Sequence, residues 1–259
     1  MVAHASPKLI GIIPAAGQAT RIAPLPCSKE LYPVGFDQSK KRPKAACEFL
    51  LGQMRAAGAA RAFIVIRDGK WDIPAYFGDG ARLDMELGYL MMNAPHGAPY
   101  TVDQAYAFVG EAHVVFGFPD ILIQPDDAFV RLAARQREGG AEIVLGVFPA
   151  AAPDKVDMVD VADDGSVRNI VIKPKTTELS HCWLIALWTP VFGAFMHDHL
   201  ALRLEQIEAS GAEIFVGDVI QAAIEDGIKV DSVAFDERYI DIGTPDDLVS
   251  AVREQFGDA

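Results

Sequence analysis

The stretch that decides the fold is LIGIIP at residues 9–14, followed directly by AAGQATR at residues 15–21. The first segment is short, apolar and rich in isoleucine, and Ala-Ala-Gly ends it, which is the pattern of a buried β-strand. In an open parallel sheet, ligands bind where the strands end. We therefore expect a parallel α/β sheet with a ligand site at the loop around Gly17.

The chain that follows this strand alternates buried strands with helices. Such alternation predicts a mostly parallel sheet that is covered by helices on both faces. The predicted elements are a helix at 44–57, a strand at 62–66, a turn at 76–80, a strand at 85–91, a helix at 103–111, a strand at 113–118, a helix at 125–138 and a strand at 141–148.

The pattern changes after residue 150. The predicted elements there are a hairpin at 156–173 with its turn at 163–165, a strand at 182–188, helices at 190–209 and 216–224, a strand at 230–240 and a last helix at 245–256. We expect a single domain over residues 1–259, with one half at about 8–150 and a second half, carrying the hairpin insert, at about 151–259.

Composition excludes several classes of protein. The 259 residues are 51% hydrophobic and carry a net charge of −13, so a nucleic-acid partner, which needs a basic face, is not expected. No apolar run is long enough to span a bilayer, and the run of about five residues near the start is shorter than the core of a signal peptide. The three cysteines form no CxxC pair, which predicts reduced thiols in a cytoplasmic protein.

The loop after the first strand is neither of the two common glycine loops. A Walker loop needs a Gly-Lys pair and a dinucleotide loop needs further glycines, whereas Ala19 and Ile22 stand at those places. A short Ala/Gly turn can still hold an anion with its backbone N–H groups. Arg21 and Lys29 follow closely and supply cations for phosphate oxygens. The alternative is a simple strand-to-helix turn with solvated cations.

The residues from Ala15 to Val34 resemble the signature of sugar-1-phosphate nucleotidyltransferases, the pyrophosphorylases that make nucleotide sugars. AAGQATRIAPL and SKELYPV match the family forms A-A-G-x-G-T-R-L-x-P-L and P-K-x-L-x-P-V. Glucose-1-phosphate thymidylyltransferase is the nearest type. The departures are Pro14 for leucine, Ala19 for glycine and Ser28 for proline. The resemblance implies the nucleotide-diphospho-sugar transferase fold, which is Rossmann-like, with the hairpin as a sugar-binding insert.

The resemblance also implies roles for residues in the loop and at two later strand ends. Asp120, in FPD, and Asp241, in YIDIGTPD, match the aspartates that hold Mg²⁺. An acidic residue at a strand end beside a phosphate loop suits Mg²⁺ on its own chemistry, although Asp120 could instead cap a turn. The implied set is Arg21, Lys29 and Asp120 as catalytic residues, Ala15, Ala16, Gly17 and Thr20 around the nucleotide, and Asp120 and Asp241 on the metal. Thr244 is expected to cap the last helix.

Two further matches are partial. Lys173 in VIKP matches a lysine that contacts the sugar phosphate, but Ile172 replaces the glutamate that contacts the sugar. Gln104 corresponds weakly to a base-reading glutamine. The implied reaction joins a nucleoside triphosphate to a sugar-1-phosphate and releases pyrophosphate, with a possible homo-oligomer as the assembly. The open alternatives are a cytidylyltransferase acting on a phosphate such as phosphocholine, and a silent nucleotide-binding regulator.

Overall fold

The structure is a computed structural model, and it describes residues 7–38, 40–92 and 96–256. The strands are β1 (Leu9–Pro14), β2 (Pro33–Asp37), β3 (Arg42–Ala45), β4 (Arg61–Ile66), β5 (Glu86–Met91), β6 (His113–Gly117), β7 (Ile121–Ile123), β8 (Ile143–Pro149), β9 (Met158–Val161), β10 (Val167–Val171), β11 (His181–Trp188), β12 (Val230–Ala234) and β13 (Tyr239–Asp241). The α-helices are α1 (Ala46–Ala56), α2 (Asp72–Phe77), α3 (Ala98–Asp103), α4 (Tyr106–Val109), α5 (Ala128–Gly139), α6 (Pro190–Ser210), α7 (Val216–Glu225) and α8 (Pro245–Phe256). Single 3-10 turns lie at Lys29–Leu31, Ala81–Leu83 and Pro153–Lys155.

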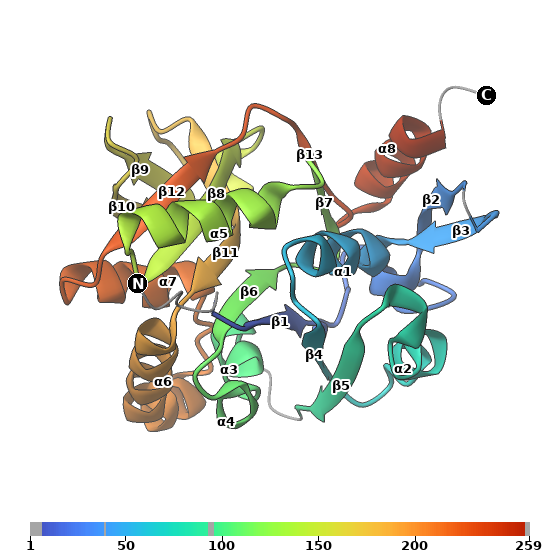
Figure 1. The fold of residues 1–259 in the computed structure, drawn as a ribbon, viewed down its shortest axis with the longest axis horizontal. Coiled ribbons are helices and arrows are strands. Elements are labelled where there is room, and N and C mark those ends of the chain that lie inside the picture. The colour runs from blue at the N-terminus through green and yellow to red at the C-terminus, as the bar shows by residue number, and fades with distance from the viewer. Residues whose placement is uncertain (1–6, 39, 93–95, 257–259) are drawn as a thin grey trace, which may run out of the picture.

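A mixed sheet forms the centre of the molecule (Figure 1). Strands β5, β4, β1 and β6 are mutually parallel, β11 runs antiparallel between β6 and β8, and β12 is parallel to β8. The connection after β1 leads to β4 on one side, while β6 lies on the other side. The end of β1 is therefore a point where the strand order reverses, and such points bind ligands in open α/β sheets. The prediction of a mostly parallel sheet is confirmed.

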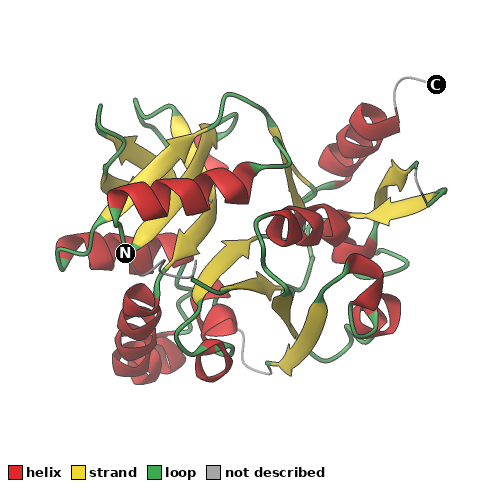
Figure 2. Ribbon diagram, viewed as in Figure 1, coloured by secondary structure: helices red, strands yellow, loops and turns green. Residues whose placement is uncertain are grey.

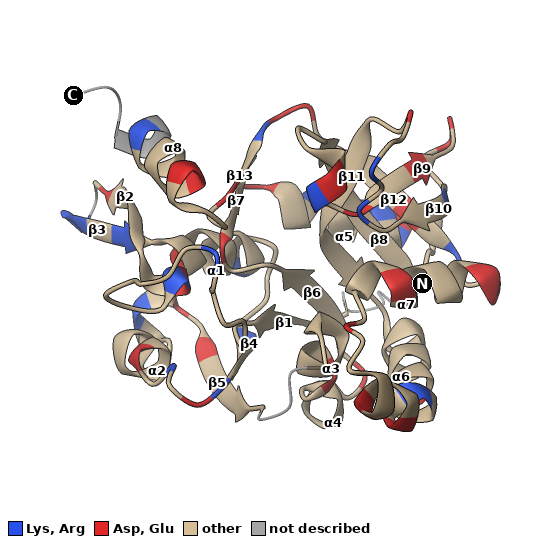
Figure 3. Ribbon diagram, turned by 180° about the vertical axis from the view of Figure 1, so that it is seen from behind, with Lys and Arg blue, Asp and Glu red and all other residues tan. Residues whose placement is uncertain are grey.

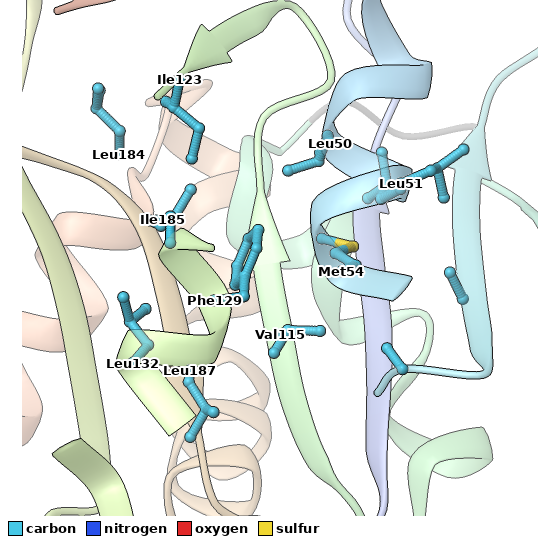
Figure 4. Packing of buried hydrophobic residues seen from close by; sticks show 14 of the residues in the cluster. Leu50, Leu51, Met54, Val115, Ile123, Phe129, Leu132, Leu184, Ile185 and Leu187 are labelled. Carbon is cyan, nitrogen blue, oxygen red and sulfur yellow. The ribbon is translucent and has the colours of Figure 1, made fainter. Parts of the chain in front are cut away.

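Helices cover both faces of this sheet (Figure 2). On one face, α1 and α5 pack on the strands through side chains that include Leu51, Met54 and Phe129, all fully or almost fully buried (Figure 4). On the other face, α3, α6 and α7 cover Val114 and Phe116 of β6. The alternation of Val115 toward one layer and Val114 toward the other follows from the two-residue period of a strand.

The predicted strand at 230–240 is wrong as one element. Strand β12 ends at Ala234, and β13 begins at Tyr239 in a separate two-stranded ladder with β7. Phe235 explains the break, because its ring is fully buried and stacks on Phe148 at 4.8 Å while its N–H still bonds to Val147. The chain is thus held on β8 up to Phe235 and then crosses to β7.

Three other predicted boundaries differ. The helix expected at 103–111 is two short helices, and α3 begins at Ala98 because Pro99 fits a first turn, where its missing N–H is not needed. The turn expected at 76–80 is preceded by α2, so it covers only Gly78 to Gly80, both at positive φ. Helix α5 begins at Ala128, and Asp127 stands at its N-cap without a side-chain cap bond. The cap by Thr244 is confirmed, since its Oγ1 accepts a hydrogen bond from the Asp247 N–H.

Four other features concern the surface charge, the β2–β3 hairpin, the cysteines and the apolar character of the helices. Figure 3 shows acidic residues on the outer helices and loops, with basic residues interspersed among them. The hairpin of β2 and β3 lies beside α8 (Figure 1). All three thiols are free, with Cys47 and Cys182 buried. Among the described residues, no helix combines the length and apolar character that a membrane crossing requires.

Candidate active site

The loop after β1 forms the floor of the candidate site. The Ala15 N–H continues the sheet by donating to the Val65 carbonyl oxygen at 2.8 Å, so this amide is already used. The Ala16 and Gly17 N–H groups donate to no acceptor within the described part of the chain. A Cβ at Gly17 would meet no atom within 4 Å. Of the residues predicted to bind an anion, Ala15 therefore has no free N–H group. Ala16, Gly17 and the exposed residues that follow, including Thr20, remain candidates.

Ala19 holds the turn of this loop in a left-handed conformation. Its φ is 53°, a region that favours glycine, and its carbonyl accepts hydrogen bonds from the Ile22 and Ala23 N–H groups. The motif that this stretch resembles has glycine at this position, and glycine adopts a positive φ without a steric penalty. The cost is backbone strain at one alanine.

Lys29 and Asp120 form an ion pair at the centre of the site. Lys29 begins the 3-10 turn at Lys29–Leu31, and Asp120 follows β6, so the pair joins two segments that are 91 residues apart in the chain. Both side chains are largely buried, at 15% and 14% exposure. Burial alone lowers the pKa of Lys29, but the charge and hydrogen bond of Asp120, with Glu30 and Asp241, more than offset it and raise the pKa.

Asp241 reaches the same place because β13 pairs with β7. The ladder sets Asp241 opposite Ile121, and the Ile242 N–H donates to the Asp120 carbonyl oxygen at 2.9 Å. Burial, followed by the negative charge of Asp120, raises the pKa of Asp241 to about 6. The Asp120 carboxylate thus lies close enough to Asp241 to disfavour the charged form of Asp241.

Arg21 closes the group on the solvent side. A Cβ at Gly243 would stand 3.1 Å from an Arg21 guanidinium nitrogen and 3.0 Å from an Asp241 carboxylate oxygen. Glycine at 243 therefore leaves the room in which the guanidinium and the carboxylate approach each other. The structure brings together Arg21, Lys29, Asp120 and Asp241, four residues that the sequence analysis selected from three separate segments.

Lys173 lies in a second group, which we call the acceptor group: Asp157, Lys173, Phe215 and Asp218. Lys173 has a φ of 40°, and its ammonium stands 3.6 Å from the centre of the Phe215 ring. Burial raises the pKa of Asp157 to about 6, with Asp218 adding to the rise and Lys173 opposing it. Asp157 Oδ1 is buried without a hydrogen-bond partner among the described residues.

Asp157 is the residue of this group that the sequence analysis missed. Its Oδ2 and the Ile172 side-chain end lie 2.5 and 2.6 Å from the point where a Cβ at Gly217 would stand. In the sequence, Ile172 stands where the family pattern has a glutamate, which suggested that this site has no carboxylate. The structure places the Asp157 carboxylate beside Ile172. An isolated aspartate before a short strand gives little sequence signal, and only the approach of its side chain to Gly217 at the start of α7 reveals it.

Gln104 is exposed, and its side-chain amide donates to the Tyr100 carbonyl oxygen within the same short helix. Metal ligation by protein alone is limited, since the described residues contain no group of three or more His, Cys, Asp or Glu side chains that could hold an ion. A divalent cation at Asp120 and Asp241 would take its other ligands from phosphate oxygens and water.

The chain is similar to known proteins over most of its length. The chain is 25% identical over 245 residues to the low-salt glycan biosynthesis nucleotidyltransferase Agl11 of Haloferax volcanii. The aligned region covers 93% of this chain and 64% of that protein. It is 24% identical over 252 residues to a glucose-1-phosphate thymidylyltransferase of Streptomyces antibioticus, at 95% and 66% coverage. The chain thus spans just under two thirds of the length of these relatives.

The fold has close structural neighbours. A putative glucose-1-phosphate thymidylyltransferase from Bacillus anthracis, solved with sucrose, superposes with a TM-score of 0.81 at 16% identity, covering 97% of this chain and 96% of that one. Residues 10–256 match the sequence profile of the family described as Nucleotidyl transferase. The matched range contains the loop after β1 and all four clustered residues, and the chain belongs to the nucleotidyl transferase family.

Proposed function

We propose that this chain catalyses nucleotidyl transfer from a nucleoside triphosphate to a sugar-1-phosphate, giving a nucleotide sugar and pyrophosphate. One observation carries the proposal: Arg21, Lys29, Asp120 and Asp241 gather at the end of β1 and β6 beside a loop with free amides. Cations for phosphates and carboxylates for a metal are the groups that phosphoryl-type transfer needs, because catalysis there is mostly positioning and charge stabilisation.

The reaction follows from this placement. The Ala16 and Gly17 amides hold the triphosphate, and Lys29 lies next to the α-phosphate. An oxygen of the sugar phosphate attacks the α-phosphorus, a new P–O bond forms, and the bond to the β-phosphate breaks. Arg21 stabilises the negative charge that collects on the leaving pyrophosphate, and Lys173 holds the acceptor's phosphate.

The two carboxylates fit a magnesium ion. Both are oxygen ligands and both are mostly buried. Burial first, and the charge of Asp120 second, raise the pKa of Asp241, and a cation between the two carboxylates would offset the second cause. When bound, Mg²⁺ neutralises charge on the phosphates. Asp120 also keeps the Lys29 ammonium beside the loop.

A second candidate is a cytidylyltransferase whose acceptor is a phosphate ester with a cationic end, such as phosphocholine. The acceptor group favours it in one respect: Asp157 offers a carboxylate, and Phe215 already carries an ammonium on its face. An aromatic face and a carboxylate are the groups that bind quaternary ammonium. The same groups also suit a sugar hydroxyl.

The test is pyrophosphate release from a matrix of nucleoside triphosphates against sugar-1-phosphates and phosphocholine, with Mg²⁺. Release with a sugar-1-phosphate supports the first candidate and release with phosphocholine the second. In the active pair, Arg21→Ala and Lys29→Ala are expected to lower the rate by roughly 10²–10³-fold. Lys175→Ala removes an exposed cation near Lys173 and is the matched control.

The metal is tested separately with Asp241→Asn. We expect the Mg²⁺-dependent rise in melting temperature with bound triphosphate to disappear, because one of the two carboxylates is gone. Asp246→Asn removes an exposed carboxylate five residues away and serves as control. Triphosphate binding without release from any pair would favour a silent nucleotide-binding protein, and an unchanged magnesium effect in Asp241→Asn would refute the assigned ligand.

A further inference from the structure

The residues on either side of Lys29 are tied to one short segment of the chain. The Ser28 N–H and hydroxyl donate to the two carboxylate oxygens of Asp72, at 2.6 and 2.7 Å. The Lys70 ammonium donates to Glu30 Oε1 at 2.5 Å. Lys70 and Asp72 are two residues apart, at the start of α2, and 40 to 44 residues distant from their partners. We call Lys70 and Asp72 the clamp.

The Lys70–Glu30 pair is one of the most buried ion pairs in the described structure, with side-chain exposures of 7% and 2%. Burial raises the pKa of Glu30 even with Lys70 beside it, and Glu30 Oε2 has no hydrogen-bond partner among the described residues. A well-packed apolar pair often stabilises a fold at least as well as a buried ion pair. An ion pair, unlike an apolar pair, is a directional contact. Here this contact fixes the position of Glu30, the residue next to Lys29.

The contacts of Asp72 with Ser28 and of Lys70 with Glu30 hold the chain on both sides of Lys29. Ser28 and Glu30 are the immediate neighbours of Lys29, and the 3-10 turn between them is closed by hydrogen bonds from the Leu31 N–H to Ser28 and from the Tyr32 N–H to Lys29. A single turn has little stability of its own, since few hydrogen bonds offset the entropy of ordering it. The clamp therefore supplies much of what keeps this turn in one place.

We propose that Lys70 and Asp72 are positioning residues that hold the turn at Lys29–Leu31, so that the Lys29 ammonium stays at the junction of Asp120 and Asp241. The proposal rests on the proposed function, which gives Lys29 its role toward the triphosphate. Neither Lys70 nor Asp72 touches substrate in this scheme. They act through Ser28 and Glu30.

Two measurements test the clamp. The first is amide hydrogen exchange at Leu31 and Tyr32, which reports the order of the turn and does not require a substrate. The variants are Lys70→Met, Asp72→Asn and the double variant Glu30→Gln/Lys70→Met, which leaves no unpaired buried charge and keeps the test valid if Lys70→Met fails to fold. Arg61→Met, which breaks an exposed ion pair between β4 and Glu86 on the neighbouring strand β5, is the matched control.

We expect exchange at Leu31 and Tyr32 to accelerate at least tenfold in the clamp variants, with core amides of β1 unchanged, and no change in Arg61→Met. Unchanged exchange at the turn would overturn the proposal. If no substrate pair reacts with the wild-type protein, the proposed function fails, and the exchange rates still decide whether the clamp orders the turn.

The second measurement is steady-state kinetics with the active pair. Misplacing a catalytic group by about 1 Å can cost about 100-fold in rate, so we expect kcat to fall on that order while the KM for the triphosphate changes much less. In a Lys29→Met background, Lys70→Met is expected to add no further loss of kcat, because residues that act through one group are not additive. Full additivity would show a merely structural role and overturn the proposal.

Discussion

The buried Asp157 carboxylate of the acceptor group should make stability fall as pH rises, and its removal should abolish that part of the pH dependence. In the native state the pKa of Asp157 is raised from 3.8 to about 6 by burial first and by Asp218 second. The native protein therefore holds this proton more tightly than the unfolded chain does. As pH rises between the two values, the folded state must lose the proton at a cost, and its stability falls.

The size of the effect follows from the two pKa values. Each pH unit between them is worth about 1.4 kcal/mol, so full ionisation costs the native state about 3 kcal/mol relative to the unfolded chain. About half of this, roughly 1.4 kcal/mol, develops between pH 5 and pH 8. Asp157→Asn carries no titrating group, so its stability relative to the wild type should rise by that amount over the same range.

Urea denaturation of the wild type and Asp157→Asn at pH 5 and pH 8 measures this difference. Other titrating groups contribute to both proteins and cancel in the comparison. Asp163→Asn removes a carboxylate from the exposed turn of the same hairpin, and so corrects for the loss of one negative charge. A difference between Asp157→Asn and wild type that stays constant or shrinks toward pH 8 would refute the reasoning.

Three further predictions concern local structure and use urea denaturation at pH 7.5. Thr244→Ala removes the cap from the Asp247 N–H and should cost about 1 kcal/mol; a loss below about 0.3 kcal/mol would contradict the cap. Ala19→Gly should leave stability unchanged or raise it by up to about 1 kcal/mol, because φ is 53° at this position; a loss of that size would show that the alanine is not strained. Phe235→Ala should cost about 3–5 kcal/mol through the cavity left against Phe148, and a loss under 1 kcal/mol would mean that the stack does not hold this crossing.

Much of the fold follows from the sequence because its strands are short apolar runs between glycine or proline signals. The strand at Leu9–Pro14 has the predicted bounds, and the long helix Pro190–Ser210 begins at its proline and ends before a left-handed glycine, as the pattern indicates. The four residues of the candidate active-site cluster could also be predicted from the sequence, because each stands in a local motif whose spacing can be compared with a family. Their meeting in space is the added information.

The rest depends on contacts that leave no local pattern. The break after Ala234 arises because the Phe235 ring stacks on Phe148 of β8. The residue pattern over 230–240 alone does not contain that contact. The clamp joins residues 40 and 44 positions apart. Asp157 gains its raised pKa only from its burial in the folded chain and from the charge of Asp218 on α7, which outweigh the opposing charge of Lys173. Sequence reasoning identifies residues by type and neighbourhood, whereas these three features are properties of tertiary packing.

The crossing from β12 to β13 also sets an order of events during synthesis. Ribosomes make the chain from the N-terminus, and a domain generally folds as a unit. The phosphate loop, Lys29 and Asp120 are therefore made well before Tyr239–Asp241, the short strand that pairs with β7 and carries the second carboxylate. A nascent chain that ends before Tyr239 therefore lacks one of the two carboxylates of the proposed metal site. Competence for the proposed chemistry thus arrives late in translation, when the growing chain returns to the half of the protein that was made first.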